Sequence, residues 1–175
     1  FVMVFPPVDD DPLWRVVARF WVPADAMDER VKRDRVPYDV WVNEGYIEAI
    51  PGEVIDYGFV FAQIDKDARL YDIRETGFDA WGASSVYLWF EQRGMTVVDI
   101  PQNYKHLSEP MKELETQVLS RRLAHGDNPV LTWMAHNLVA TKDPQDNIKP
   151  NKKASIEKID GMVALIMAEA RAMTY

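Results

Sequence analysis

Residues 73–100 read IRETGFDAWGASSVYLWFEQRGMTVVDI, and this stretch decides the fold. Its two apolar ends, residues 73–79 and 96–100, are typical of short strands. Residues 84–93 between them are typical of a helix, which Gly94 ends. Because a strand, a helix and a second strand follow one another, we expect a parallel βαβ unit and an α/β fold.

Segments on both sides extend this unit. Residues 1–5 and 14–22 are expected to form two antiparallel strands, joined by a polar loop that contains Asp9, Asp10 and Asp11. Helices are expected from capping residues, Pro positions and apolar periodicity at about residues 23–35, 37–45, 56–70, 108–119 and 129–137, with a strand at residues 46–50. Asp56 and Ser108 are the expected N-caps, and residues 121–125 are expected at a helix C-terminus.

The C-terminal part predicts a hairpin followed by a long helix. Residues 138–148 contain the polar turn DPQDN and are expected to form a β-hairpin. Residues 155–173 have helical periodicity, with an apolar stripe of Ile156, Ile159, Val163, Ile166, Ala170 and Met173. No internal repeat or linker interrupts the chain, so we interpret residues 1–175 as one domain.

Composition limits the chemistry of the protein. The 175 residues include no cysteine, which excludes thiolate zinc sites and disulfides, and carboxylates then favour hard cations such as Mg²⁺ or Mn²⁺. The net charge of -8 argues against a general nucleic-acid coat, although metal-binding carboxylates also make a protein acidic. The longest apolar run, residues 161–168, is too short to span a bilayer, and a soluble intracellular protein is expected.

Two aspartates stand out as candidate metal ligands. Asp79 follows a predicted central strand, at the end where α/β sheets collect ligands, although an Asp there also commonly caps a turn or helix. Trp81, close by, is expected in the core. Asp160 is expected inside the last helix on its apolar stripe, where a carboxylate is costly unless an ion pair or a metal compensates it. Gly161 beside it suggests a close approach of another segment.

Several motifs together resemble the C-terminal nuclease domain of tailed-phage terminase large subunits. They are IRETGFDAWGA, VVDIPQNYKHLSEPMKELE, RRLAHGDNPVLTWMAHNLVA and NIKPNKKASIEKIDGMVALIMA, and an earlier segment, RFWVPADAMDERVKRDRVPYDVWVNEGYIEAIPGEVIDY, also fits. The resemblance covers nearly the whole chain. It implies an RNase H-like mixed sheet flanked by helices, with a two-metal carboxylate site.

The resemblance assigns roles to the two aspartates. Asp79 matches the second acidic position of the family, and Asp160 matches the last one. Both would be catalytic and would bind two ions of Mg²⁺ or Mn²⁺, which activate water for attack on phosphorus. The family's first acidic residue lies on a first central strand that we expect to be missing here, so this fragment is expected to be truncated and incomplete as a nuclease. No GxxxxGK[ST] loop of an ATPase domain occurs either.

A set of lysines near the hairpin is a weaker candidate for DNA-backbone contacts. These are Lys142, Lys149, Lys152, Lys153 and Lys158. They could bind phosphates without regard to sequence, but interleaved Asp143, Asp146 and Glu157 fit a solvated loop equally well.

The resemblance implies an endonuclease that cuts concatemeric double-stranded viral DNA during packaging, in the cytoplasm of a bacterial host. Its implied partners are double-stranded DNA, the terminase small subunit, the portal protein and an ATPase domain of the same full-length chain. Two alternatives remain at this point. One is another RNase H-like nuclease of the resolvase or transposase type, and the other is a non-catalytic docking module of the packaging motor.

Overall fold

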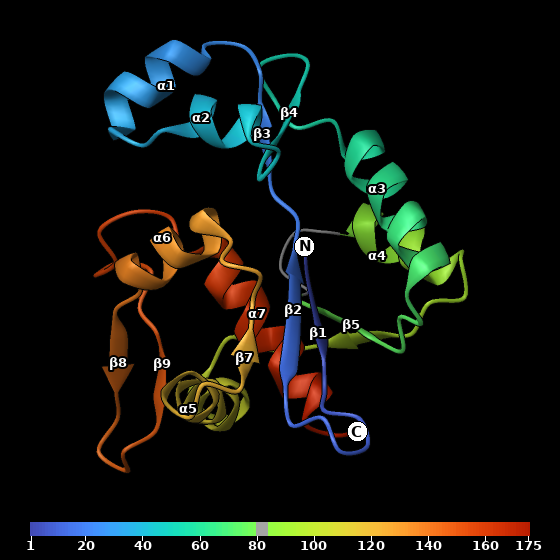
Figure 1. The fold of residues 1–175 in the computed structure, drawn as a ribbon, viewed down its shortest axis with the longest axis vertical. Helices are drawn as coiled ribbons and strands as arrows, with labels where there is room; N and C mark the ends of the chain where they lie inside the picture. The colour runs from blue at the N-terminus through green and yellow to red at the C-terminus, as the bar shows by residue number, and fades with distance from the viewer. Residues whose placement is uncertain (80–83) are drawn as a thin grey trace. The chain divides into compact units, whose positions relative to one another are not determined.

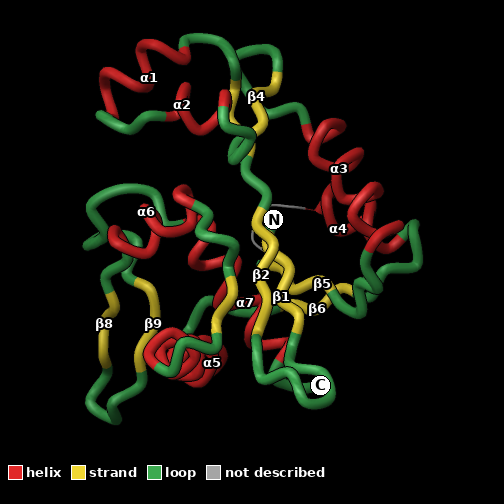
Figure 2. The backbone as a smooth tube through the Cα atoms, viewed as in Figure 1, coloured by secondary structure: helices red, strands yellow, loops and turns green. Residues whose placement is uncertain are grey.

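A computed structural model describes residues 1–79 and 84–175, so Trp81 lies outside the described residues. The described chain divides into two compact units. Unit 1 comprises Phe1–Ala18, Ile73–Asp127 and Leu131–Tyr175, and unit 2 comprises Arg19–Asp72 and Asn128–Val130. Figure 1 shows the described chain as a ribbon, and its labels mark the helices and strands named below except β6, which is labelled in Figure 2.

Unit 1 contains a mixed three-stranded sheet. Strand β1 (Val2–Phe5) pairs antiparallel with β2 (Trp14–Ala18), which confirms the expected pairing of the first two strands. On its other edge β2 pairs in parallel with the very short β7 (Leu123–Ala124). The buried side of β1 packs against helix α7 (Asp160–Ala172), so this helix covers the sheet.

The βαβ unit is confirmed. Strand β5 (Thr76–Phe78) leads through α4 (Ser84–Glu91) to β6 (Val97–Asp99), and the two strands pair in parallel. Figure 2 shows β5 and β6 beside one another. Gly77 lies close to the end of β6, because a Cβ atom there would lie 2.5 Å from Cδ1 of Ile100, and the Ile100 side chain would have to shift.

Helices and a hairpin complete unit 1. Helix α5 (Tyr104–Leu119) packs against α7 and against the hairpin of β8 (Ala140–Lys142) and β9 (Ile148–Pro150). Helix α6 (Pro129–Asn137) precedes that hairpin. The expected hairpin before the last helix is therefore confirmed, and so is the mixed α/β class with flanking helices.

Unit 2 contains the remaining elements, in the order β3 (Trp21–Pro23), α1 (Met27–Asp34), α2 (Tyr38–Asn43), β4 (Glu48–Ile50) and α3 (Tyr57–Leu70). Strands β3 and β4 pair in parallel. Asp56 caps α3 as expected, because its Oδ1 atom accepts a hydrogen bond of 2.8 Å from the backbone nitrogen of Gly58. An ion pair between Arg19 and Asp67 joins α3 to the segment before β3.

Some expectations about element boundaries are wrong. Residues 14–22 form two strands in different sheets, because the chain leaves the sheet at Arg19. Helix α5 begins at Tyr104 with Asn103 as its cap, whereas Ser108 is buried within the helix and its Oγ accepts from the Ile148 nitrogen at 3.1 Å. Residues 121–125 include strand β7, which tertiary pairing with β2 creates.

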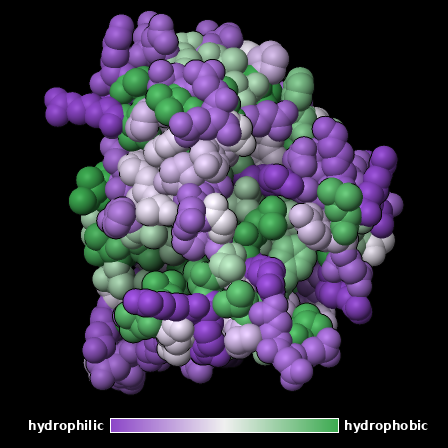
Figure 3. All heavy atoms as spheres, in the orientation of Figure 1, coloured by the Kyte–Doolittle hydropathy of each residue, from purple (hydrophilic) through white to green (hydrophobic). Residues whose placement is uncertain are grey.

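One face of the molecule is mostly hydrophilic. Figure 3 shows hydrophilic residues over most of the visible face, with hydrophobic residues in scattered patches. Among the described residues, no helix is long and apolar enough to cross a membrane.

A buried polar pair links α5 and α7 inside unit 1. Gln117 and Glu169 have no exposed surface, and Nε2 of Gln117 donates to Oε1 of Glu169 at 2.5 Å. The other two oxygens, Oε1 of Gln117 and Oε2 of Glu169, have no hydrogen-bond partner among the described residues. A protonated Glu169 would supply the missing donor between them. Burial raises the pKa of Glu169 to about 7, against the opposing effect of the Gln117 hydrogen bond and with a further increase from Glu113.

The stability of the protein is therefore expected to fall as the pH rises. In the folded state the pKa of Glu169 is about 7, against an ordinary 4.5. The stabilisation that its proton gives is therefore fully present below pH 4.5 and is lost as the pH rises to about 7. This difference corresponds to roughly 3 kcal/mol. Denaturant unfolding between pH 5 and pH 8 measures it.

The matched variants isolate this carboxyl. Glu169→Gln keeps the shape and supplies an amide donor, so it should be more stable than the wild type at pH 8 and should remove most of the pH dependence. Glu115→Gln changes an exposed residue of α5 and should unfold with the wild-type profile. A Glu169→Gln profile as steep as that of the wild type would contradict the prediction.

Candidate metal centre

Asp79 lies where the sequence places it, directly after β5. It is half-buried, and its Oδ2 atom accepts a hydrogen bond of 2.6 Å from Nε2 of Gln102. Gln102 follows β6, the parallel neighbour of β5, so both residues lie at the carboxyl end of this strand pair. Sequence analysis did not single out Gln102, although its position after a parallel strand is a signal that points to this end of the sheet.

Asp160 has a different environment from the one expected. Helix α7 begins at Asp160 and not at residue 155, and the Asp160 side chain is exposed rather than on the apolar stripe. Ile156, expected on that stripe, is 81% exposed. The physical reason is a local turn, because the side chain of Asn151 accepts from the backbone of Ala154 and the Ser155 hydroxyl donates to the Asn151 carbonyl. Such bonds compete with helix formation.

The start of α7 is nevertheless closely packed. The backbone nitrogen of Gly161 is buried and lies 3.1 Å from Sδ of Met134 in α6. Nδ2 of Asn137, at the end of the same helix, donates to the Lys158 carbonyl at 3.4 Å. The close approach expected at Gly161 is therefore observed, and α6 fixes the backbone on both sides of Asp160.

Contacts along α7 show which way β5 runs beside it. Nε of Arg171, near the end of the helix, donates to Oε2 of Glu75 at 2.6 Å, and this bond holds the pKa of Glu75 below its ordinary value. Two residues later, a Cβ atom on Gly77 would lie 3.5 Å from the Met167 carbonyl oxygen and 3.7 Å from Cγ of Arg171, so Gly77 lies between these two positions of the helix. Strand β5 therefore runs toward the start of α7.

This direction points Asp79 toward the N-terminal half of α7. Phe78 and Asp79 continue the chain past Gly77, away from Glu75 and its partner Arg171. Because α7 begins at Asp160, β5 runs toward the end of the helix that carries the second candidate carboxylate.

The chemistry of these side chains fits a hard divalent cation. Mg²⁺ takes oxygen ligands, and one or two carboxylates with waters and substrate phosphates suffice to hold it. Within residues 1–79 and 84–175, no group of three or more His, Asp or Glu residues is arranged to hold a metal ion.

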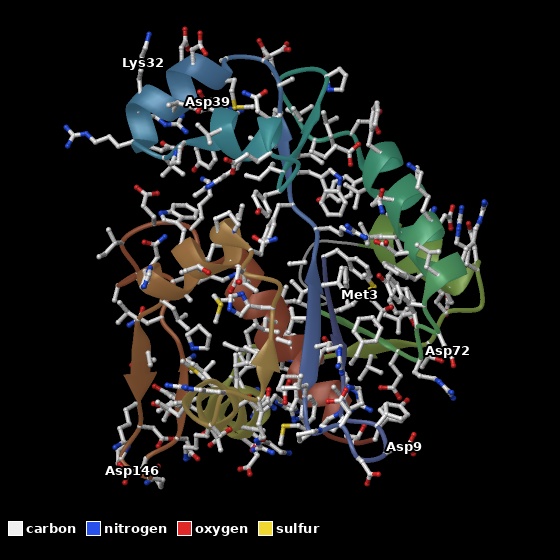
Figure 4. All side chains as sticks on the ribbon, in the orientation of Figure 1. Met3, Asp9, Lys32, Asp39, Asp72 and Asp146 are labelled. Carbon is white, nitrogen blue, oxygen red and sulfur yellow. The ribbon has the colours of Figure 1, made fainter. Side chains whose placement is uncertain are left out.

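Asp9, labelled in Figure 4, lies in the turn between β1 and β2 as expected, where Asp11 pairs with Arg15 at 2.6 Å.

The lysine set has mixed surroundings. Nζ of Lys142 lies 2.7 Å from Oδ1 of Asp146, and both side chains are exposed. Asp146, labelled in Figure 4, lies at the tip of the hairpin. Nζ of Lys149 lies 5.0 Å from the centre of the Tyr104 ring. Lys152, Lys153 and Lys158 are exposed on the segment between β9 and α7. This segment leads directly to Asp160, so the exposed lysines follow the chain to the candidate site.

The chain is similar to known proteins over almost its whole length. Residues 2–175 match the family model described as terminase large subunit, endonuclease domain. The chain is 38% identical over 161 residues to the large subunit of the terminase of Enterobacteria phage HK97, covering 91% of this chain and 32% of that protein. It is 34% identical over 168 residues to protein YmfN of Escherichia coli (strain K12), covering 93% of this chain and 37% of that protein.

A solved structure shows the same fold. The crystal structure of the HK97 bacteriophage large terminase superposes with a TM-score of 0.88 at 36% identity, covering 98% of this chain and 36% of the terminase. The chain spans about a third of the length of these relatives. The match over almost every residue, in sequence and in structure, establishes that the chain belongs to the terminase large subunit endonuclease domain family.

Proposed function

We propose that this domain is a metal-dependent endonuclease that cuts concatemeric double-stranded viral DNA during genome packaging. The observation that carries the proposal is the position of Asp79 at the carboxyl end of the paired strands β5 and β6, on a strand that runs toward the start of α7, where Asp160 lies. Family membership supports it, because the matching family model describes an endonuclease domain. The resolvase or transposase alternative has no comparable support.

In this proposal Asp79 and Asp160 bind Mg²⁺ or Mn²⁺. The cations, when bound, would activate a water molecule and stabilise the leaving oxygen of the cleaved phosphodiester. The chain itself contributes rigidity, since β5 and α6 fix the backbone around the two carboxylates. Hydrolysis joins the oxygen of water to phosphorus and breaks one P–O bond, and the leaving oxygen takes up a proton.

The proposed cellular setting is the one that the resemblance to terminase large subunits implies. The domain would act within a longer protein that also carries an ATPase domain, together with a terminase small subunit and a portal protein, in the cytoplasm of the bacterial host. The expected experiment is incubation with supercoiled plasmid and Mn²⁺, which should give nicked and linear DNA that EDTA suppresses. A version extended upstream should be tested in parallel, because the resemblance implies a further acidic residue there. Intact plasmid in both would favour a non-catalytic docking module.

We also propose that exposed lysines before α7 hold the DNA backbone. Replacing Lys152 and Lys153 by alanine together should weaken binding to any duplex equally. Each lost phosphate contact should reduce the slope of log affinity against log salt concentration by about 0.9. Fluorescence anisotropy with labelled duplexes over a range of salt concentrations measures this slope.

A second double variant controls for net charge. Lys32→Ala with Lys66→Ala removes the same charge from exposed residues of α1 and α3. If both double variants reduce the slope equally, the effect comes from net charge and the proposed contacts of Lys152 and Lys153 are wrong.

A further inference from the structure

We propose that Gln102 is a positioning residue that orients the carboxylate of Asp79 for metal binding. The inference rests on the function proposed above, in which Asp79 is a ligand. Gln102 would not touch the metal or the DNA. It would act only through Asp79.

The contact itself is short and well placed. Nε2 of Gln102 donates to Oδ2 of Asp79 at 2.6 Å, across 23 positions of the chain. Both side chains are half-buried, which limits the competition from water. A hydrogen bond to an ionised acceptor is about twice as strong as a neutral one. The amide of Gln102 is therefore able to select one orientation of the Asp79 carboxylate.

Gln102 is itself held by the backbone on both sides. On one side, the nitrogen of the buried Ile100 donates to the Phe78 carbonyl at 2.8 Å and extends the pairing of β6 with β5. On the other side, the nitrogen of Asn103 donates to the Pro101 carbonyl at 2.8 Å, and Asn103 caps α5. The fixed φ angle of Pro101 stiffens the connection further. Gln102 therefore presents its amide from a rigid junction between β6 and α5.

The chemistry of a carboxylate allows it to accept a hydrogen bond and to ligate a cation at the same time. An ionised carboxylate offers about four acceptor positions on its two oxygens, so accepting from the Gln102 amide does not by itself exclude metal binding. Hydrogen bonds to the ligands of a metal fix their orientation, and their loss typically costs 10–100-fold in metal affinity. A glutamine suits this task because its amide donates without adding a charge beside the cation.

The test is direct measurement of Mn²⁺ binding by isothermal titration calorimetry, with no DNA present. Gln102→Leu and Gln102→Met both remove the donor, and the methionine variant keeps an unbranched chain in case the leucine variant fails to fold. Each should bind Mn²⁺ about 10–100-fold more weakly than the wild type. Gln145→Leu, at an exposed position of the hairpin turn, is the matched control and should bind as the wild type does.

Two further measurements separate the possible results. Thermal unfolding in EDTA reports any structural role, so a folded variant that unfolds earlier but binds Mn²⁺ with wild-type affinity overturns the inference. Asp79→Asn tests the proposed function independently. If Asp79→Asn also binds Mn²⁺ like the wild type, the metal site itself is wrongly placed, whereas loss of binding in Asp79→Asn alone refutes only the role of Gln102.

Discussion

Replacing Asp79 or Asp160 by asparagine is expected to slow metal-dependent plasmid cleavage by more than about 100-fold. Loss of a residue that merely orients a metal ligand typically costs 10–100-fold, so loss of a ligand should cost more. Asparagine keeps the shape of the side chain but removes the negative charge that binds the cation. The rate of conversion of supercoiled plasmid at saturating Mn²⁺ measures the effect, in the 175-residue chain and in the upstream-extended version.

Two acidic positions provide controls for this experiment. Asp9 lies in the β1–β2 turn with a φ angle of 52°, a conformation that asparagine also accepts, so Asp9→Asn should fold and cleave normally. Glu157 is exposed three residues before Asp160, and Glu157→Gln should also leave cleavage unchanged. If Asp160→Asn cleaved at the wild-type rate, its assignment as a ligand would be wrong, even though the family membership would stand.

Replacing Arg19 by alanine is expected to destabilise unit 2 by about 2–3 kcal/mol, which is less than the cost of breaking a fully buried ion pair because the Arg19 side chain is 35% exposed. Asp67 is 0% exposed, and its two oxygens accept from Nε and Nη2 of Arg19 at 3.0 and 2.7 Å. Gln63 adds a third hydrogen bond of 3.2 Å. Without Arg19 the buried carboxylate loses both charge-assisted bonds. Hydrogen exchange of the amides of α3 should report the loss directly.

A double variant tests whether the cost comes from the unpaired charge. Arg19→Met with Asp67→Leu replaces the pair by apolar side chains and should recover most of the stability lost in Arg19→Ala. Arg69→Ala removes an exposed arginine from the same helix and should have little effect. Unchanged exchange rates in Arg19→Ala would show that the ion pair does not hold α3 in place.

The parts of the fold that local sequence determines were predicted correctly. The antiparallel pair of β1 and β2, the βαβ unit of β5, α4 and β6, and the hairpin of β8 and β9 each depend on residues near one another in the chain. Turn residues and apolar periodicity carry enough information for such elements. Asp56 was recognised as a cap for the same reason.

The incorrect boundaries depend on contacts between distant residues. Residues 14–22 look like one strand, but the Arg19 side chain pairs with Asp67, 48 positions away, where the chain passes from β2 toward β3. Strand β7 is too short to show a periodicity of its own and exists because β2 offers an open edge. Ser108 has the residue type of a cap, yet its hydroxyl oxygen accepts a hydrogen bond from the nitrogen of Ile148 in the hairpin, 40 positions away.

The candidate site was predicted in part. Residue type and position single out both Asp79 and Asp160 as candidates, and the resemblance implies their metal-binding roles. Helical periodicity then placed Asp160 on a buried stripe, whereas the turn made by Asn151 and Ser155 delays the helix and leaves the side chain exposed. The sequence does not predict a role for Gln102, because a single glutamine in a loop belongs to no motif. Only the parallel pairing of β5 with β6 brings Gln102 next to Asp79.

The central claim is that Asp79 and Asp160 share a metal centre, and a crystal structure of the protein soaked in Mn²⁺ tests it most directly. Anomalous diffraction locates the ion independently of any assumption about its ligands. We expect an anomalous peak at about 2.1 Å from a carboxylate oxygen, the distance typical of a small hard cation, with both aspartates in the centre. It would be contradicted by carboxylates more than about 8 Å apart, since two ions of one centre lie only about 4 Å from each other.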